Sequence, residues 1–217
     1  MQKKFVASLV KELADESNSE AARMMAAVIC KNLIGNRTND ARYADLWIQL
    51  EPFFKQNMKE AILSTLVCPS SLVRTQCANL IASIAAIEIP RGEWTEVITN
   101  LCTNASSEVP NVKLASLQTL GFICEELEPK DLTNELKNAV IVALTTNIDK
   151  DENQKAQGYP ATKLAVQALL HSLPYAAQNF KVENERAFIM AKIFSAMEVS
   201  DVDIRENALQ VLVELAR

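Results

Sequence analysis

Apolar and small residues recur at helical spacing after three basic positions in the chain. They stand three, four and seven places after Arg74, after Lys113 and after Arg205. Residues with that spacing share one face of an α-helix, so each segment predicts an amphipathic helix. Their small size also predicts close packing between helices. The positions are Cys77, Ala78 and Ile81, then Ser116, Leu117 and Leu120, then Ala208, Leu209 and Leu212.

The same pattern extends over most of the sequence and predicts ten helices. We expect the segment 40–66 to break before Pro52, because proline is favoured in the first turn of a helix and disrupts its interior. The predicted helices span about 3–14, 18–35, 40–66, 70–86, 91–104, 110–126, 130–148, 160–173, 181–198 and 202–216.

Four prolines divide these helices into units of similar length. Pro52, Pro90, Pro129 and Pro174 are separated by 38, 39 and 45 residues, and a helical pattern follows each of them. A unit of about 40 residues with two helices is typical of HEAT and armadillo repeats. The second helix of each unit begins with an aliphatic–basic pair, at Val73-Arg74, Val112-Lys113 and Ile204-Arg205, and slipped by one at Thr162-Lys163. Asp203 adds the Asp-x-Arg spacing of HEAT units.

The expected fold is therefore all-α: a right-handed superhelical solenoid of about five HEAT repeats, with helices in antiparallel pairs. We expect a single array with repeats at about 3–35, 40–86, 90–126, 130–173 and 181–217. The polar stretch 149–159 is expected to be a mobile insertion. Neither end of the chain has the polar capping helix that solenoids need, so we expect terminal repeats of a longer array to be missing.

The composition argues against an enzyme. The four glycines, Gly35, Gly92, Gly121 and Gly158, lie far apart, so they cannot build a phosphate-binding loop. His171 is the single histidine, which excludes a multi-histidine metal site and leaves one residue for any Ser-His or Cys-His catalysis. We therefore expect no catalytic residue, no cofactor and no metal.

Charge and cysteine content limit the compartment and the partners. The net charge is −5 and no basic stripe with interleaved aromatics occurs, so a nucleic-acid groove is not expected. The five cysteines form no CxxC motif and lie in or beside apolar helical runs, which predicts buried, reduced thiols in the cytosol or nucleus. The longest apolar runs, such as 80–87 and 139–144, are shorter than the roughly 20 residues of a membrane helix, and the N-terminus has no signal-peptide core.

Four segments resemble one known family. They are "ICKNLI" at 29–34, "IEIPRGEWTEVI" at 87–98, "LGFICEELEP" at 120–129 and "NFKVENERAFIM" at 179–190. Their order and spacing resemble the importin-β (karyopherin-β) family from about residue 4 to the end. The resemblance implies an N-terminal portion of a nuclear import receptor, without its first repeat.

The same resemblance implies the partners. The inner surface of the N-terminal repeats would bind the GTPase Ran in its GTP form. Outer grooves between successive first helices of the repeats would bind the phenylalanine-glycine repeats of nucleoporins. The import adaptor or cargo would bind mainly to later repeats, which are absent here. The protein would then occur in cytoplasm and nucleus and at the nuclear pore.

The resemblance places a phenylalanine pocket on two helices. It falls on Ile141, Val142 and Thr145, faced by Glu185, Phe188 and Ile189, although the family more often has an aliphatic residue where Thr145 stands. On a wheel of about 100° per residue, Ile141, Thr145 and Ile148 lie away from the core face. This second apolar stripe predicts either an outer groove or packing on a neighbouring repeat. A core role for Phe188 also remains open.

The resemblance also makes Lys31 and Asn32 candidates for contact with Ran. If Ala22, Ala26, Ile29 and Leu33 face the core, Lys31 lies nearly opposite them. A lysine in that position can equally be a plain solvated residue.

Trp47 and Trp94 are interpreted as anchors between helices, with partner contact as the alternative, and His171 as a structural or surface residue. A HEAT scaffold of another kind, such as a phosphatase or complex-assembly subunit, remains the alternative function.

Overall fold

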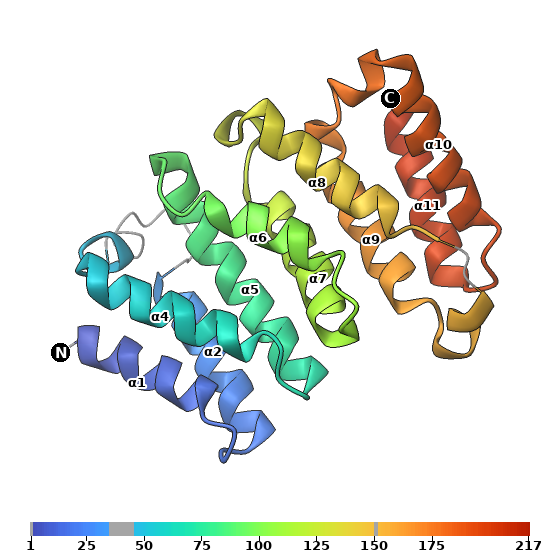
Figure 1. Ribbon diagram of the computed structural model, residues 1–217. Helices are drawn as coiled ribbons and strands as arrows, with labels where there is room; N and C mark the ends of the chain where they lie inside the picture. The colour runs from blue at the N-terminus through green and yellow to red at the C-terminus, as the bar shows by residue number, and fades with distance from the viewer. Residues whose placement is uncertain (1, 35–45, 150–151) are drawn as a thin grey trace. The chain divides into compact units, whose positions relative to one another are not determined.

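The computed structural model describes residues 2–34, 46–149 and 152–217 and is built from helices (Figure 1). Within these residues no strand occurs, which confirms the all-α prediction and, with the solved relatives described below, the HEAT class. Two compact units can be distinguished, residues 1–95 and 96–217. The sense of the superhelix and the single continuous array stay predictions.

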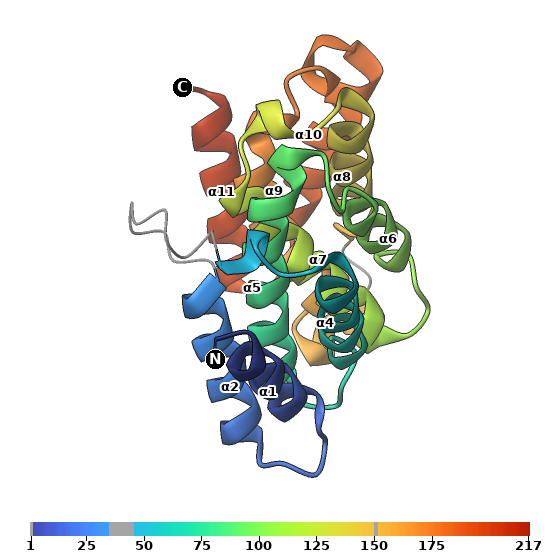
Figure 2. The same cartoon turned by 90° about the vertical axis from the view of Figure 1, so that its left-hand side faces the viewer.

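Unit 1 contains two stacked helix pairs. The first pair is α1 (Gln2–Ala14) and α2 (Glu20–Ile34), and the second is α4 (Pro52–Thr65) and α5 (Ser71–Glu88). α1 packs on α4, and α2 packs on α5, so the first helices of the pairs form one layer and the second helices form another. Figure 2 shows α1 and α2 side by side. We call these two kinds of helix A helices and B helices.

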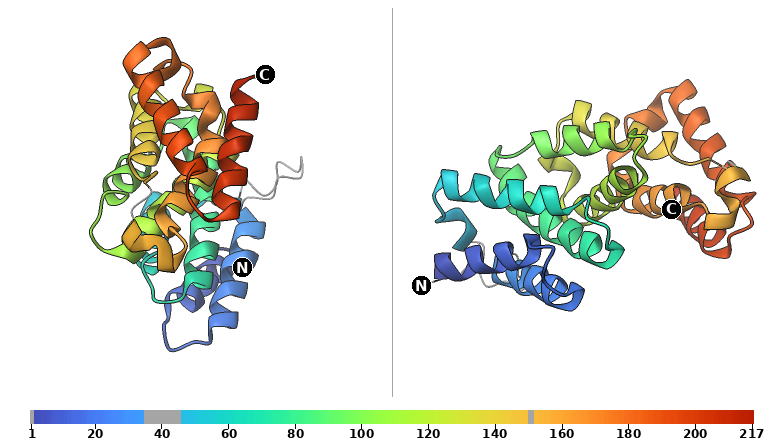
Figure 3. Two further views of the ribbon diagram at one scale, coloured as in Figure 1. Left: turned by 90° about the vertical axis from the view of Figure 1, so that its right-hand side faces the viewer. Right: turned by 60° about the horizontal axis from the view of Figure 1, so that its bottom comes forward.

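Unit 2 contains three pairs built in the same way. The A helices are α6 (Glu96–Asn104), α8 (Asn134–Thr146) and α10 (Glu183–Met197). The B helices are α7 (Pro110–Glu126), α9 (Pro160–Ser172) and α11 (Val202–Leu215). α8 contacts both α6 and α10, and α9 contacts both α7 and α11. Figure 3 shows the last pair, α10 and α11, lying against each other.

Most helix boundaries agree with the sequence patterns, and two start later than predicted. Segment 91–104 begins with a turn in which Gly92 has φ 75° and Trp94 has φ 56°, so α6 starts only at Glu96. Segment 130–148 begins with a short 3-10 turn at Pro129–Asp131, after which Thr133 caps α8. The start of the predicted helix 40–66 lies outside the described residues, but α4 begins at Pro52 as expected.

Helix N-termini are satisfied by local side chains. The Oγ of Ser70 accepts a hydrogen bond from the backbone N–H of Val73 at 3.2 Å, and the Oδ1 of Asp201 accepts one from Ile204 at 3.2 Å. Proline stands in the first turn of α4, α7 and α9. Ser70 and Asp201 supply acceptors for first-turn N–H groups, which have no partner within the helix, whereas proline has no N–H group there to be left unpaired.

Basic residues near the start of the B helices form hydrogen bonds at the C-terminal ends of the A helices. Val73 is buried, whereas Arg74 donates from its guanidinium to the carbonyl oxygens of Cys68 and Pro69, each at 2.7 Å. Arg23 donates to the carbonyl of Leu13 at 2.9 Å in the same way. These carbonyls lie at or just beyond the C-terminal ends of α4 and α1, where the last helical carbonyls lack helical partners. In unit 1, the basic residue near the start of each B helix thus satisfies carbonyls at the C-terminal end of its own A helix.

Unit 1 encloses a charged cluster around Glu88, whose exposed fraction is 1%. Its carboxylate accepts from Trp47 Nε1 at 2.9 Å and from Lys59 Nζ at 2.8 Å, and Lys55 Nζ lies 3.4 Å away. Lys59 Nζ also lies 4.8 Å from the centre of the Trp94 ring. Both tryptophans are buried, which confirms their interpretation as anchors between helices.

Among the described residues, one helix reaches the length and apolar composition of a membrane span. It is α5 with the following 3-10 turn, Ser71–Arg91, although 72% of its apolar window is buried inside the protein. The sequence runs had suggested that none is long enough. Its burial is that of a core helix, which passes the same test.

Candidate functional site

The predicted phenylalanine site falls where α8 and α10 meet in unit 2. Here Val142 is 48% exposed and Phe188 is 45% exposed, and Glu185 is also exposed. Polar contacts connect the two helices around these residues. We call this surface the α8–α10 seam and define it by the side chains of Asn138, Val142, Asn179, Glu185, Phe188 and Lys192.

Two sets of hydrogen bonds hold the seam together. At one end, Asn179 Nδ2 donates to Asn138 Oδ1 at 2.6 Å and to Glu185 Oε2 at 2.9 Å. At the other end, Lys192 Nζ donates to the carbonyl of Ile148 at 3.0 Å and lies 5.7 Å from the centre of the Phe188 ring. The cation over the ring face is a favourable electrostatic contact.

Three of the six residues that the resemblance placed in the phenylalanine pocket are buried inside the protein. Ile141 and Thr145 are each 1% exposed and Ile189 is 2% exposed. Of the two alternatives for this stripe, an outer groove or packing on a neighbouring repeat, the structure shows packing for Ile141 and Thr145. The physical reason is that α8 packs on α6, α9 and α10, so its second apolar stripe is covered by neighbours. The hydroxyl of Thr145 is satisfied by the carbonyl of Ile141 at 2.7 Å.

The accessible part of the predicted site is therefore Val142, Glu185 and Phe188. Ile141, Thr145 and Ile189 can contribute only from beneath this surface. The structure also brings Asn179 and Lys192 to the site, neither of which the sequence predicted as a site residue. Lys192 shares a helical face with Glu185 and Phe188, seven and four residues earlier, whereas no pattern connects Asn179 with Asn138.

The predicted Ran contacts lie on α2, whose buried face differs from the expected one. The buried residues are Arg23, Ala26, Ala27, Cys30 and Ile34, whereas Ala22, Ile29 and Leu33 are only half-buried. Asn32 is exposed, but Lys31 is half-buried at the edge of the core face rather than opposite it. The expectation failed because Arg23 occupies a core position, with an exposed fraction of 6%. A hydrophobicity pattern places a charged residue outside the core and its apolar neighbours inside.

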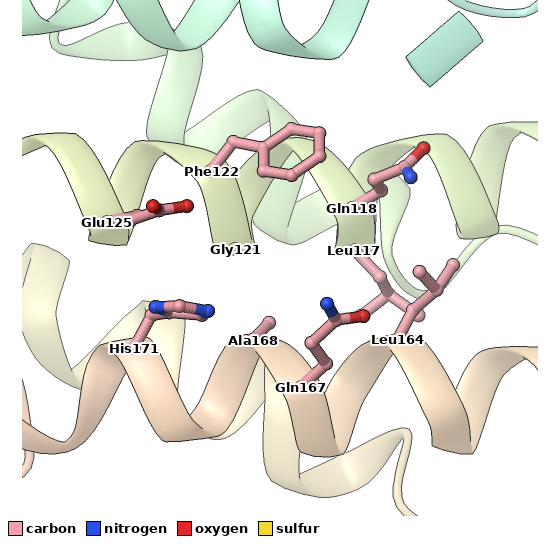
Figure 4. Close-up of a pocket in the computed structure, with 9 residues that line it drawn as sticks. All are labelled: Leu117, Gln118, Gly121, Phe122, Glu125, Leu164, Gln167, Ala168 and His171. Carbon is pink, nitrogen blue, oxygen red and sulfur yellow. The ribbon is translucent and has the colours of Figure 1, made fainter. Parts of the chain in front are cut away.

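A pocket that the sequence did not predict lies between the B helices α7 and α9 (Figure 4). Gly121 of α7 faces Ala168 of α9, and a Cβ added at Gly121 would lie 3.0 Å from the Cβ of Ala168. Glu125 and His171 lie on the facing helices at one end of the pocket, and Gln118 and Gln167 lie at the other. The single histidine thus lines a partly buried pocket, and no group of three or more potential metal ligands occurs among the described residues.

Four of the five cysteines lack the properties of nucleophiles. All five are free thiols, and four are buried. Burial raises the pKa of the Cys30, Cys77 and Cys102 thiols to about 12, and it raises the pKa of Cys124 further. Because the thiolate is the reactive form, these side chains remain protonated and unreactive at neutral pH.

Comparison with known proteins agrees with the fold and with the resemblance. Residues 1–67 match the family described as importin-beta N-terminal domain. The chain is 31% identical to importin subunit beta-1 of Arabidopsis thaliana over 214 residues, and 31% identical to that of Schizosaccharomyces pombe over 214 residues. These alignments cover 98% and 97% of this chain but 24% of each relative.

Solved structures show the same similarity. Yeast importin-β, Kap95p, superposes on 98% of the chain with a TM-score of 0.88 and 29% identity, and the chain covers 25% of it. A structure of Kap95p binding RanGDP gives the same values, and a complex of Kap95 with Nup1 gives a TM-score of 0.83. The chain therefore spans about a quarter of the length of the relatives that it matches, and it belongs to the importin-β family.

Proposed function

We propose that the chain acts as part of a nuclear import receptor that binds Ran in its GTP form and the phenylalanine-glycine repeats of nucleoporins. The observation that carries this proposal is the chain-long similarity to importin subunit beta-1 and to Kap95p, of which one structure contains Ran and another contains Nup1. In this role the chain is a carrier and not an enzyme, and it moves between cytoplasm and nucleus through the nuclear pore. Import adaptor or cargo binds mainly to later repeats of such a receptor.

For Ran, we propose that the B-helix residues Lys31 and Asn32 contribute to binding. Asn32 is exposed and Lys31 is half-buried, so both side chains have accessible atoms on α2. The test is capture of Ran loaded with GTP or with GDP by the immobilised chain. Binding should favour the GTP form, and Lys31→Glu should weaken it, while the exposed Lys4→Glu on α1 should leave it unchanged. Equal capture of both nucleotide forms would contradict the transport role and favour a general HEAT scaffold.

For nucleoporins, we propose that a phenylalanine ring packs on Val142 and Phe188 in the α8–α10 seam, with Glu185 accepting a backbone N–H of the peptide. Burying a ring contributes about 1.5–3 kcal/mol, so each contact is weak and rapidly reversible. Such contacts suit a receptor that must pass many repeats in succession.

Two exposed substitutions test the seam without burying a charge. Phe188→Ser and Val142→Asp should each reduce binding of a phenylalanine-glycine peptide. The matched controls are Phe194→Ser and Val213→Asp, because Phe194 is 51% exposed and Val213 is 44% exposed outside the seam. Ran binding should persist in all four variants. If both seam variants bind the peptide as the unchanged chain does, the seam is not the nucleoporin site.

A further inference from the structure

Asn179 occupies an unusual position for an amide side chain. It is 5% exposed and begins a 3-10 turn, Asn179–Lys181, that leads directly into α10. Its backbone carbonyl accepts from the N–H of Val182 at 3.2 Å, which fixes it close to the start of that helix. A buried amide has to find partners, since an unsatisfied polar group is costly inside a protein.

The two partners of Asn179 belong to different helices. Its Nδ2 carries two hydrogens, and one is directed to Asn138 of α8 while the other is directed to Glu185 of α10. Glu185 lies in the first turn of α10, where the helix dipole also favours a carboxylate. One amide group therefore fixes the orientation of the Glu185 carboxylate and links α8 to α10.

The distribution of contacts leaves the middle of the seam accessible. Lys192 makes the second link, to the carbonyl of Ile148 beyond the end of α8. Between the two links, Val142 and Phe188 keep about half of their surface exposed. Polar bonds therefore connect the two helices on both sides of Val142 and Phe188, whose surfaces remain available to an apolar group.

We propose that Asn179 is the positioning residue of the α8–α10 seam. It holds the Glu185 carboxylate toward a bound peptide and fixes the spacing of α8 and α10 at which Val142 and Phe188 receive one phenylalanine ring. Asn179 acts through Glu185 and Asn138 and does not itself contact the peptide. The inference rests on the proposed function, because it names what prepares the nucleoporin site for its ligand.

The test exchanges the donor and the acceptor between Asn179 and Glu185. Asn179→Asp has the same shape, but it places a carboxylate against the carboxylate of Glu185 and should weaken binding of a phenylalanine-glycine peptide about tenfold, the scale of one hydrogen bond to a charged group. In the double variant Asn179→Asp/Glu185→Gln, the glutamine amide can donate to the aspartate, and the amide of Asn138 can turn to do the same. Affinity should then return to within about twofold of the unchanged chain.

The matched control is Asn79→Asp on α5. Asn79 Nδ2 donates only within its own helix, to the carbonyl of Thr75 at 3.1 Å, so peptide affinity should not change. Dissociation constants are measured by calorimetry on the whole chain, with a melting curve for each variant. Because Glu185→Gln also removes the repulsion between the two carboxylates, recovery of affinity in the double variant identifies positioning when the melting temperatures of the two variants are alike.

Three results would overturn the inference, and they are distinguishable. If the unchanged chain binds the peptide but the double variant remains as weak as Asn179→Asp, Asn179 does not act through Glu185. Equal affinity of Asn179→Asp and the unchanged chain would refute the role of Asn179 entirely. If the unchanged chain itself binds no phenylalanine-glycine peptide, the proposed nucleoporin function fails and this inference fails with it.

Discussion

Glu88 and its partners show what a single buried side chain contributes. Its carboxylate receives hydrogen bonds from Trp47 and Lys59, and Lys59 also lies over the ring of Trp94. An ion pair taken out of water is stable only when both partners and their hydrogen bonds are present. Removing one member therefore leaves a buried charge without compensation, and the effect should greatly exceed that of any exposed pair in the same unit.

Glu88→Ala should lower the free energy of unfolding by about 3–5 kcal/mol, because Lys59 and the Trp47 indole N–H lose their acceptor. The measurement is urea denaturation followed by tryptophan fluorescence. Glu93→Ala is the control, since the Glu93 side chain is 52% exposed and pairs with Lys55 at 3.2 Å; it should cost about 1 kcal/mol or less. If both variants lost similar free energy of unfolding, the buried ion pair of Glu88 would contribute no more than the exposed pair of Glu93.

The buried thiols predict how stability depends on alkaline pH. The pKa values of Cys30, Cys77 and Cys102 are about 12 in the folded protein, against 9.0 for an ordinary thiol. Below about pH 9 both states hold these protons, so the thiols cause no pH dependence. Above it the unfolded chain loses protons that the folded protein keeps, and the free energy of unfolding should fall until about pH 12.

The expected slope is up to about 1.4 kcal/mol per pH unit for each thiol that is ionised in the unfolded chain. Urea unfolding at about pH 8 and about pH 10 measures it. The fall between the two conditions should be smaller in Cys77→Ala than in the unchanged chain, whatever the absolute stability of the variant. An identical fall would assign the alkaline effect to other groups.

At the level of elements, the sequence predicted helices well and their solvent-facing sides less well. The proline spacing and the apolar periodicity located every described A and B helix, because both signals are local. The same periodicity failed on α2, and on α8 it left two alternatives open. It cannot show that Arg23 finds a carbonyl partner inside the core, nor that the second stripe of α8 is covered by neighbouring helices.

The candidate site was therefore only partly predictable. The resemblance found the two helices that form the seam, and the structure leaves Val142, Glu185 and Phe188 accessible there. The resemblance could not find Asn179, because the hydrogen bond between Asn179 and Asn138 joins residues 41 positions apart and depends on how the repeats stack. Contacts between repeats have no period in the sequence by which to find them.

Gly121 gives a test at the level of helix packing. Gly121→Ala would place a methyl group 3.0 Å from the Cβ of Ala168, so α7 and α9 would have to separate, at a cost of about 1–3 kcal/mol in unfolding free energy. The double variant Gly121→Ala/Ala168→Gly moves the methyl group to the other helix and should recover much of the loss. Thermal melting measures both. A loss in the double variant equal to the sum of its single substitutions would show that contact with Ala168 is not the cause.

For the whole molecule, the repeat construction predicts unfolding in more than one step. Within each unit a helix pair contacts chiefly the adjacent pair, so stability is a sum of local terms and partial unfolding is accessible. Trp47 and Trp94 both belong to unit 1, whereas helices of both units contribute to circular dichroism. Fluorescence therefore reports unit 1 alone.

The two signals should give different midpoints when the chain is unfolded in urea. Circular dichroism should also show helix and no substantial strand content before unfolding begins. A chain in which Phe122→Trp adds a probe to α7 in unit 2 provides the control, because its fluorescence should include a component that follows the second unit. Coincident transitions for all probes would mean that the chain unfolds as one cooperative body.

The contact between Gly121 and Ala168 has a mechanical consequence for unit 2. A helix interface in direct backbone contact resists compression, whereas an interface joined at its surface by a few polar side chains can widen. In the B layer, the backbone of Gly121 lies directly against Ala168, so compression there meets immediate resistance. In the A layer, α8 and α10 are joined at the seam surface by the Asn179 and Lys192 links, beside half-exposed Val142 and Phe188. Changes of curvature in unit 2 should therefore alter the width of the α8–α10 seam more than that of the α7–α9 contact, which is already closed.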